Sequence, residues 1–219
     1  MARVIAAAAG LALAAWWLWS RQAGAVAYAD GEMPQDSGAA DFDLPNVFSN
    51  ITDMMTPTDQ DQAATNEAAF LMMIRTAEGT ADANGYRRLF GGDLFSGWDD
   101  HPRQARRYRD VWTSAAGAYQ FMAISPIPGT DKSTRVNTWD RIAARLGLRD
   151  FSPASQDAAA LELIREAGAL GDVRAGRFDQ AVSKVRRIWA SLPGAGYGQP
   201  ERSLQALRAA YLNAGGYLA

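Results

Sequence analysis

Residues 70–80 read Phe-Leu-Met-Met-Ile-Arg-Thr-Ala-Glu-Gly-Thr, an apolar helical pattern that ends on a carboxylate followed by glycine. The apolar positions that share one helical face are Phe70, Met73, Ile74 and Ala77. Asn66 stands where an N-cap would start this helix. The pattern therefore predicts a helix from Asn66 to Glu78 with its apolar side in the core.

Glu78 follows Ile74 by one helical turn and shares the core-facing stripe. Burial penalises the charged form of a carboxyl, and so does the negative end of the helix dipole, so we expect the pKa of Glu78 to be raised. A carboxyl that is protonated near neutral pH is a general acid. From these residues alone, the alternative is an ordinary helix end whose glutamate lies in water.

Composition describes a globular chain, because 48% of the 219 residues are hydrophobic and 21% are charged. There is no cysteine, which excludes disulfides, thiolate nucleophiles and zinc-thiolate sites. A single histidine, His101, excludes a His-based metal cluster, and its place beside Pro102 favours a structural role. The sequence predicts neither a metal site nor a cofactor.

Charge is distributed unevenly along the chain. Residues 22–74 hold nine acids and no Lys or Arg, whereas residues 75–219 hold 20 Lys plus Arg against 15 Asp plus Glu. An acidic segment thus precedes a mildly basic domain, which suits a polyanionic substrate or surface. The basic run 103–109 contains one aromatic residue and no recognition motif, so no nucleic-acid partner is predicted.

The first 25 residues are predicted to be a membrane signal-anchor. Residues 4–19 are 16 uncharged residues that end in a tryptophan cluster typical of a membrane interface. This run is shorter than the roughly 20 residues that span a bilayer comfortably. Arg3 favours a cytoplasmic N-terminus, which places the rest of the chain in the periplasm. Small-residue patterns at 25–29 leave open the alternative of a cleaved signal peptide.

Residues 26–65 are rich in Asp, Gly, Pro, Gln, Ser and Thr and are predicted to be an acidic linker. The sequence leaves open whether its apolar pieces, Phe48 and Met54-Met55, dock on the domain that follows. That domain, 66–219, first shows a Gly-, Asp- and aromatic-rich stretch typical of short strands and turns. Helical periodicity then returns over 139–146, 153–167, 178–189 and 200–213. We predict an α+β class, mostly helical with a small β region and preceded by an N-terminal hydrophobic helix.

Several segments occur together in a fixed order. They are Thr76-Ala-Glu78-Gly-Thr80, Asn84-Gly-Tyr86-Arg-Arg-Leu-Phe90-Gly-Gly-Asp93, Asp100-His-Pro-Arg103, Ser114-Ala-Ala-Gly-Ala-Tyr119-Gln120, Thr138-Trp-Asp140, Phe151-Ser-Pro-Ala-Ser-Gln156-Asp157 and Ile188-Trp-Ala-Ser-Leu-Pro-Gly-Ala-Gly-Tyr197-Gly-Gln199. Across about 150 residues, 66–216, the chain resembles the phage lambda endolysin family of lytic transglycosylases.

The resemblance implies a lysozyme-like fold and cleavage of the β-1,4 bond between N-acetylmuramic acid and N-acetylglucosamine in peptidoglycan. It places Glu78 at the family's catalytic glutamate, which acts as acid and then as base and leaves a 1,6-anhydro sugar. It also implies the residues that contact the glycan, namely Tyr86, Tyr119, Gln120, Tyr197 and Gln199. For Tyr119 the alternative is a buried tyrosine with a satisfied hydroxyl.

Hydrolysis by a muramidase would need a second carboxylate near Glu78. The candidates are Asp82, Asp93, Asp99 and Asp100, and none is compelling because aspartates in turns usually cap their own backbone.

Two features depart from the family. Ala118 stands where relatives often carry arginine, so a charged contact at the groove is either missing or supplied by Arg87 or Arg88. Residues 125–135 form a longer loop than in the lambda protein, and we expect it to cover or extend the groove.

We predict a monomeric endolysin that acts on peptidoglycan glycan strands for host cell lysis and is anchored to the inner membrane through residues 4–19 before it acts in the periplasm. The alternative is a virion-associated muralytic protein used at phage entry.

Overall fold

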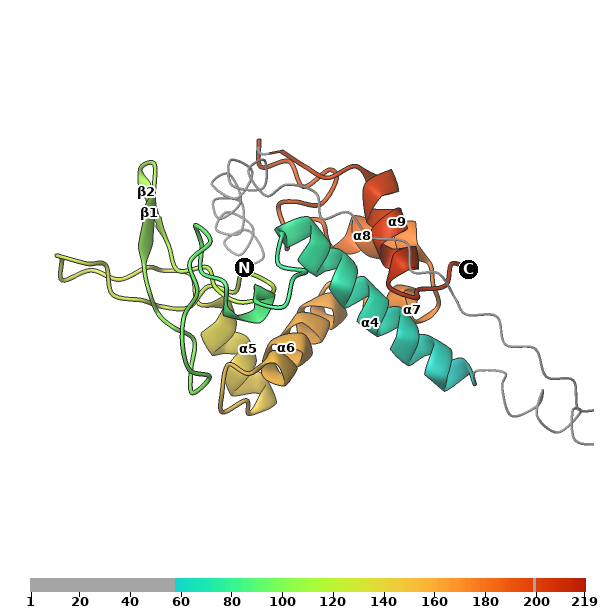
Figure 1. The fold of residues 1–219 in the computed structure, drawn as a ribbon, viewed down its shortest axis with the longest axis horizontal. Helices are drawn as coiled ribbons and strands as arrows, with labels where there is room; N and C mark the ends of the chain where they lie inside the picture. Colours follow the sequence, from blue (N-terminus) through green and yellow to red (C-terminus); the bar gives the residue numbers. More distant parts are fainter. Residues whose placement is uncertain (1–57, 199) are drawn as a thin grey trace, which may run out of the picture.

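The computed structural model describes residues 58–198 and 200–219. Figure 1 shows helices on one side, loops and a small hairpin on the other, and α4 running from the first group to the edge of the second. The elements are α4 (Asp59–Glu78), the 3-10 helix η1 (Gly85–Arg87), β1 (Arg106–Tyr108), β2 (Val111–Thr113), α5 (Thr138–Leu146), α6 (Pro153–Glu166), α7 (Leu170–Arg174), α8 (Phe178–Val185) and α9 (Leu204–Asn213). This confirms a mostly helical fold with a small β region.

The hydrophobic helix predicted over 4–19 and most of the linker predicted over 26–65 lie outside the described residues. Within the part of the chain that is described, no helix is long and apolar enough to cross a membrane.

Helix α4 begins earlier than predicted. Thr58 is its N-cap and forms a capping box with Asp61, in which the Thr58 hydroxyl accepts the Asp61 N–H at 3.2 Å and the Asp61 carboxylate accepts the Thr58 N–H at 3.1 Å. The first two turns of α4 are largely exposed and polar. They therefore carry no apolar stripe from which the sequence could have predicted them.

The N-cap role predicted for Asn66 is wrong, because this residue lies inside α4 and is 1% exposed. Its amide Nδ2 donates to the carbonyl oxygen of Arg174 at 3.0 Å, and its Oδ1 accepts the N–H of Tyr217 at 2.8 Å. Asn66 thus joins α4 to the end of α7 and to the C-terminal tail.

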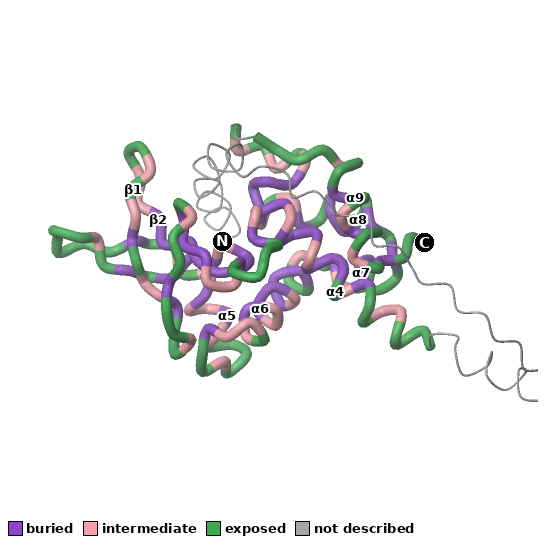
Figure 2. The backbone as a smooth tube through the Cα atoms, in the orientation of Figure 1, coloured by how far each residue is buried: buried purple, intermediate pink, exposed green. Residues whose placement is uncertain are grey.

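The apolar face of α4 is the centre of the core. Phe70, Met73, Ile74 and Ala77 are all fully buried, as predicted, and α4 packs against α6, α7 and α9. The Phe70 ring lies edge-on to Phe178 at 6.2 Å between centroids. In Figure 2 the buried backbone follows the middle of the molecule, and the start of α4 and the tips of the loops are exposed.

Most other helix ends follow their local signals. Helix α5 ends at Gly147, whose φ is 67°, and α6 begins after the N-cap Ser152 with Pro153 in its first turn. Helix α8 ends at Val185, although its predicted apolar stripe continued to 189. The short α7 was not predicted.

A second aromatic cluster lies beneath the loop side of the molecule. Phe151 contacts Trp139 of α5 at 4.5 Å and His101 at 4.9 Å between ring centroids. His101 is 2% exposed, and burial lowers its pKa to about 4. The neutral ring fits the contacts, because Nε2 lies 2.9 Å from the carbonyl oxygen of Phe121 and Nδ1 accepts the N–H of Arg103 at 3.1 Å. This structural role is the one predicted.

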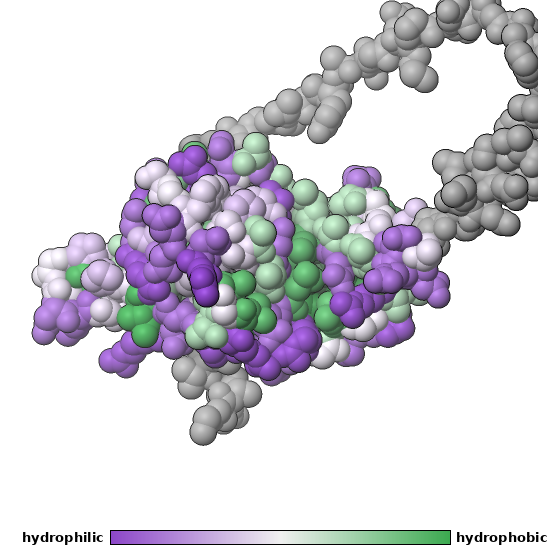
Figure 3. Space-filling model, turned by 90° about the horizontal axis from the view of Figure 1, so that it is seen from below, coloured by the Kyte–Doolittle hydropathy of each residue, from purple (hydrophilic) through white to green (hydrophobic). Residues whose placement is uncertain are grey.

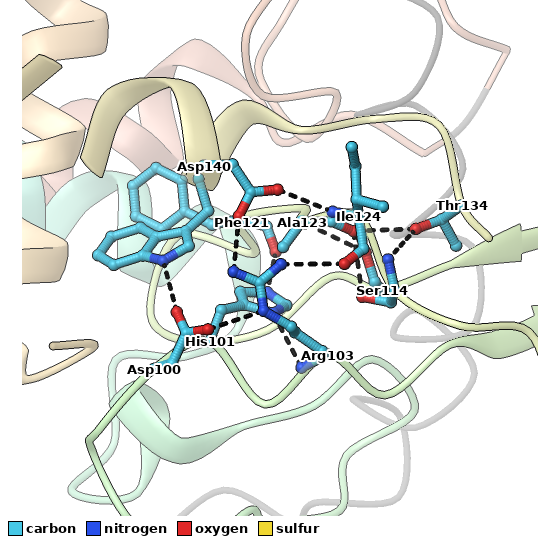
Figure 4. A network of polar contacts seen from close by, with 11 residues as sticks. Asp100, His101, Arg103, Ser114, Phe121, Ala123, Ile124, Thr134 and Asp140 are labelled. Carbon is cyan, nitrogen blue, oxygen red and sulfur yellow. Dashed lines mark hydrogen bonds and ion pairs between the residues drawn. The ribbon is translucent and has the colours of Figure 1, made fainter. Parts of the chain in front are cut away.

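The longer loop at 125–135 is held firmly at its base (Figure 4). Arg103 donates to the Ile124 carbonyl oxygen at 3.0 Å and to Asp140 of α5 at 2.7 Å, and Asp140 accepts the Ile124 N–H at 3.0 Å. Thr134 closes the loop by accepting the N–H of Ser125 at 2.9 Å.

Two extensions therefore leave the loop side of the molecule. Strands β1 and β2 pair antiparallel, with Arg107 opposite Trp112, and the loop at 125–135 carries a bridge between Pro126 and Ser133. The face seen in Figure 3 is mainly hydrophilic, with a band of apolar residues across its middle.

Candidate active site

Glu78 is the last residue of α4 and is almost completely buried, with 3% of its surface exposed. Gly79 ends the helix at φ 71°, a left-handed conformation that glycine adopts without steric cost. The chain then turns sharply, and the Thr80 N–H returns to the Arg75 carbonyl oxygen at 2.8 Å.

Burial raises the pKa of Glu78 from its ordinary value of 4.5 to about 8, which confirms the predicted direction. One hydrogen bond opposes this effect: the Ser191 hydroxyl donates to Glu78 Oε1 at 2.7 Å and favours the ionised form. The carboxyl is therefore protonated at neutral pH, and it has a donor in place for the moment when it loses its proton.

Ser191 was not singled out from the sequence. It lies in the loop after α8, is 3% exposed, and is separated from Glu78 by 113 residues. A serine within the run Ala-Ser-Leu has no periodicity or motif of its own, so only its place inside the Ile188–Gln199 segment could have drawn attention to it.

Arg75, one turn before Glu78, holds the segment that follows the carboxylate. Its guanidinium is buried and donates to the carbonyl oxygens of Thr80 and Asp82, each at 3.2 Å. It also lies over the Tyr86 ring at 4.3 Å from the centroid and donates to the Tyr86 hydroxyl at 3.3 Å. The turn after Glu78 is therefore fixed from inside.

Thr80 carries this bonding across to the segment around Ala118. Its hydroxyl donates to the Ala118 carbonyl oxygen at 2.5 Å, and the Ala118 N–H donates to Gln156 Oε1 of α6 at 2.8 Å. Whether Arg87 or Arg88 supplies the charge of the arginine that relatives often carry at Ala118 stays a prediction. Arg87 donates to the Phe95 carbonyl oxygen and Arg88 pairs with Asp82, whereas Arg75 binds Thr80 directly.

Tyr86 and Tyr119 converge on Asp157 of α6. The Tyr119 hydroxyl donates to Asp157 at 2.6 Å and the Tyr86 hydroxyl at 2.8 Å, and burial followed by the Asp157 carboxylate raises the pKa of both phenols. Tyr119 is 2% exposed. Tyr119 therefore matches the alternative to a sugar contact, a core tyrosine with a satisfied hydroxyl. In this structure its ring is not open to a sugar. Tyr86 is half-buried, and its sugar contact stays a prediction.

The remaining predicted glycan contacts lie on turns. Gln120 is half-buried at φ 50°, and its side chain donates to the Gly117 carbonyl oxygen at 2.9 Å. Tyr197 is half-buried, and its hydroxyl donates to the Arg187 carbonyl oxygen at 2.9 Å. Gln199 lies outside the described residues. The roles of these residues toward a sugar stay predictions.

The aspartates considered as second carboxylates beside Glu78 either form ion pairs with arginines or are exposed. Asp82 pairs with Arg88 at 2.6 Å, Asp93 with Arg106 at 2.6 Å and Asp100 with Arg103 at 2.7 Å, while Asp99 is exposed. Among the described residues no second carboxylate contributes to the raised pKa of Glu78. The same part of the chain holds no group of three His, Asp or Glu side chains that could bind a metal ion.

Comparison with known proteins identifies the family. The family model described as endolysin matches residues 68–218. The chain belongs to the endolysin family. This endolysin is 41% identical over 167 residues to the endolysin of Escherichia phage P2, covering 69% of the chain and 93% of that protein. It is 40% identical over 155 residues to the endolysin of Escherichia phage lambda, covering 68% of the chain and 90% of that protein.

Solved structures agree with the sequence comparison. The endolysin superposes on bacteriophage lambda lysozyme complexed with a chitohexasaccharide with a TM-score of 0.62 at 38% identity, covering 71% of this chain and 97% of that one. A second structure of the lambda lysozyme gives a TM-score of 0.60 at 37% identity, with the same shares covered. The lysozyme-like fold predicted from the sequence is thereby confirmed.

Proposed function

We propose that this endolysin is a peptidoglycan lytic transglycosylase that cleaves the β-1,4 bond between N-acetylmuramic acid and N-acetylglucosamine and leaves 1,6-anhydro ends. Family membership makes it a lysozyme-like enzyme that lyses peptidoglycan. The proposal adds the chemistry of the step. The observation that carries it is one buried carboxyl, whose pKa burial raises, without a carboxylate partner among the described residues.

Glu78 can serve both halves of such a reaction. In its protonated form it donates to the glycosidic oxygen as the bond from that oxygen to C1 of the muramic acid breaks. The carboxylate that remains accepts a hydrogen bond from Ser191. It then takes the proton of the C6 hydroxyl as that oxygen bonds to C1, so Glu78 ends protonated and no water is consumed.

Hydrolysis by a pair of carboxylates is the competing mechanism. It requires a second carboxylate roughly 5 to 10 Å from the acid, free to act as nucleophile or to activate water. The ion pairs of Asp82, Asp93 and Asp100 with arginines favour the single-carboxylate mechanism.

Mass spectrometry of digested peptidoglycan tests the proposal. We expect fragments that end in 1,6-anhydro-N-acetylmuramic acid from the wild-type enzyme and no release of fragments by Glu78→Gln. Fragments with reducing ends would show a muramidase instead. Full lytic activity of Glu78→Gln would exclude Glu78 as the acid.

We also propose that the enzyme reaches the periplasm through residues 4–19, which act as a signal-anchor, and that it serves host cell lysis. The export route rests on the sequence of that segment alone, and the role in lysis is supported by family membership. Because the hydrophobic segment is short, we expect the anchor to leave the membrane when the inner membrane is depolarised. Cell fractionation tests this: the full chain is expected in the membrane fraction before depolarisation of the inner membrane and in the soluble fraction afterwards. A soluble protein at all times would contradict the anchor, and its recovery in purified particles would favour a role at entry.

A further inference from the structure

The loop between α8 and α9 connects directly to the catalytic carboxyl. Ser191, the sixth residue after α8, binds Glu78, and the Arg202 N–H near the end of the loop donates to the Ser191 carbonyl oxygen at 2.8 Å. Ser191 therefore joins the later part of the loop to Glu78. This backbone bond is the link through which the end of the loop can act on Ser191, which is itself buried.

Glu201 binds two backbone N–H groups of the same loop. Its carboxylate accepts the Gly194 N–H at 2.6 Å and the Gly196 N–H at 3.0 Å, one on each oxygen. Both glycines have positive φ, 74° and 77°, with Ala195 between them. Alternation of this kind turns backbone N–H groups toward one point and creates an anion site, which here is filled by the chain's own Glu201.

Within the glycine turn the Ala195 N–H donates to the Leu192 carbonyl oxygen at 3.2 Å, and the two glycine N–H groups bind Glu201. Gly194 and Gly196 are exposed, and glycines with positive φ lose much conformational entropy when they are ordered. Hydrogen bonds to an ionised acceptor are stronger than neutral ones, so the two bonds to the Glu201 carboxylate hold this turn more strongly than the neutral Ala195 bond does. Glu201 itself is exposed, which means that its replacement leaves the core intact.

We propose that Glu201 is a positioning residue, whose carboxylate braces the Gly194–Gly196 turn and, through the adjoining Arg202–Ser191 hydrogen bond, holds the Ser191 hydroxyl on Glu78. This inference rests on the proposed function, because it assigns to Ser191 and Glu201 the task of preparing the acid for its second role as a base. Without the brace the loop moves, and the Ser191 hydroxyl spends less time on the carboxylate.

The test reads the ionisation of Glu78 directly, by NMR titration of its side-chain carbon in the full-length protein. Ser191→Ala should raise the pKa of Glu78, because the ionised form loses its donor. Glu201→Gln should raise it in the same direction, since an amide can accept only one of the two N–H groups and presents its own N–H to the other. The double variant should shift it no further than Ser191→Ala alone. Asp131→Asn, which also removes an exposed carboxylate but lies in the loop at 125–135, should leave it unchanged.

A Glu78 pKa that stays at the wild-type value in Glu201→Gln while Ser191→Ala shifts it would overturn the proposal. So would additive shifts in the double variant, because they would show two independent effects. Glu201→Asp keeps the charge but holds the carboxylate on a side chain too short to reach both glycine N–H groups, so it should also raise the pKa of Glu78. This variant replaces Glu201→Gln in the test if the amide disturbs folding.

Activity gives a second readout. For Glu201→Gln we expect kcat on glycan fragments to fall roughly tenfold with little change in KM, as for an interaction used after binding. Failure of the proposed function would appear as reducing ends from the wild-type enzyme and would leave the Glu78 titration intact. Failure of the Glu201 inference would appear in the titration and leave the products unchanged.

Discussion

Replacing Glu78 by glutamine should stabilise the folded protein at neutral pH and leave its stability at acidic pH almost unchanged. The folded protein holds the Glu78 proton with a pKa of about 8, whereas the unfolded chain holds it at about 4.5. The stability contributed by this group is therefore fully present below about pH 4.5 and is lost as the pH rises through about 8. Glutamine fills the same space, can accept the Ser191 hydrogen bond and cannot ionise.

The magnitude follows from the size of the shift. One pKa unit corresponds to about 1.4 kcal/mol. A shift from 4.5 to about 8 makes Glu78 lower the free energy of unfolding by on the order of 5 kcal/mol above pH 8, where it ionises in the core, and by about 3 kcal/mol near pH 7, where the folded state must keep a proton that the unfolded chain releases. The difference in unfolding free energy between variant and wild type should grow by about these amounts from acidic pH upward.

Urea denaturation followed by tryptophan fluorescence measures this difference across the pH range. The pH dependence of wild-type stability alone does not isolate Glu78, because the pKa values of other groups also differ between the folded and unfolded states. Asp172 has its pKa lowered by hydrogen bonds from Lys184 and Arg177, so its contribution is gained as pH rises and has the opposite sign. A difference between the two proteins that does not vary with pH would falsify the inference that Glu78 is buried as a neutral acid.

Four further outcomes are expected. Lytic activity should fall as the pH rises past about 8, because Glu78 must be protonated to act as an acid, and an initial rate that keeps rising there contradicts this. Gly85→Ala should cost about 3 kcal/mol or more by urea denaturation, because an added Cβ would lie 1.7 Å from the Thr80 carbonyl oxygen, and a stable variant would show that the turn can yield. Asn66→Ala should cost about 2 to 3 kcal/mol, since it leaves buried backbone groups without partners, and a neutral result would mean that water replaces the amide. Thr58→Ala should cost about 1 kcal/mol through loss of the capping box, and an unchanged midpoint would show that the first turn frays in the wild type.

Local signals predicted much of the fold. Gly147 ends α5, and Ser152 with Pro153 starts α6, because each residue acts through its own backbone geometry. The start of α4 could not be predicted from periodicity, since a helix that projects into solvent needs no apolar face. Its true cap, Thr58, is recognisable only by the Asp three residues later.

The candidate site also contains residues that local sequence predicts and residues that only the folded chain brings together. The stripe of α4 predicted the burial and raised pKa of Glu78 and left an exposed helix end as the alternative, and the family resemblance then marked Glu78 as the catalytic glutamate. Ser191 was not predicted, since it reaches Glu78 from 113 residues away. The shared use of Asp157 by Tyr86 and Tyr119 likewise depends on contacts over 71 and 38 residues, which no local spacing encodes.

The side-chain bonds of Asn66 have a mechanical consequence. Helix α4 is 20 residues long, roughly 30 Å, and joins everything that precedes Thr58 to Glu78 at its far end. A pull on the N-terminal side of the domain would be loaded along this rod. Asn66 ties the rod to the end of α7 and to the C-terminal tail about 18 Å before Glu78. Such a force would pass through the Asn66 hydrogen bonds into α7 and the C-terminal tail before it reached Glu78, and the geometry of the carboxyl would be preserved.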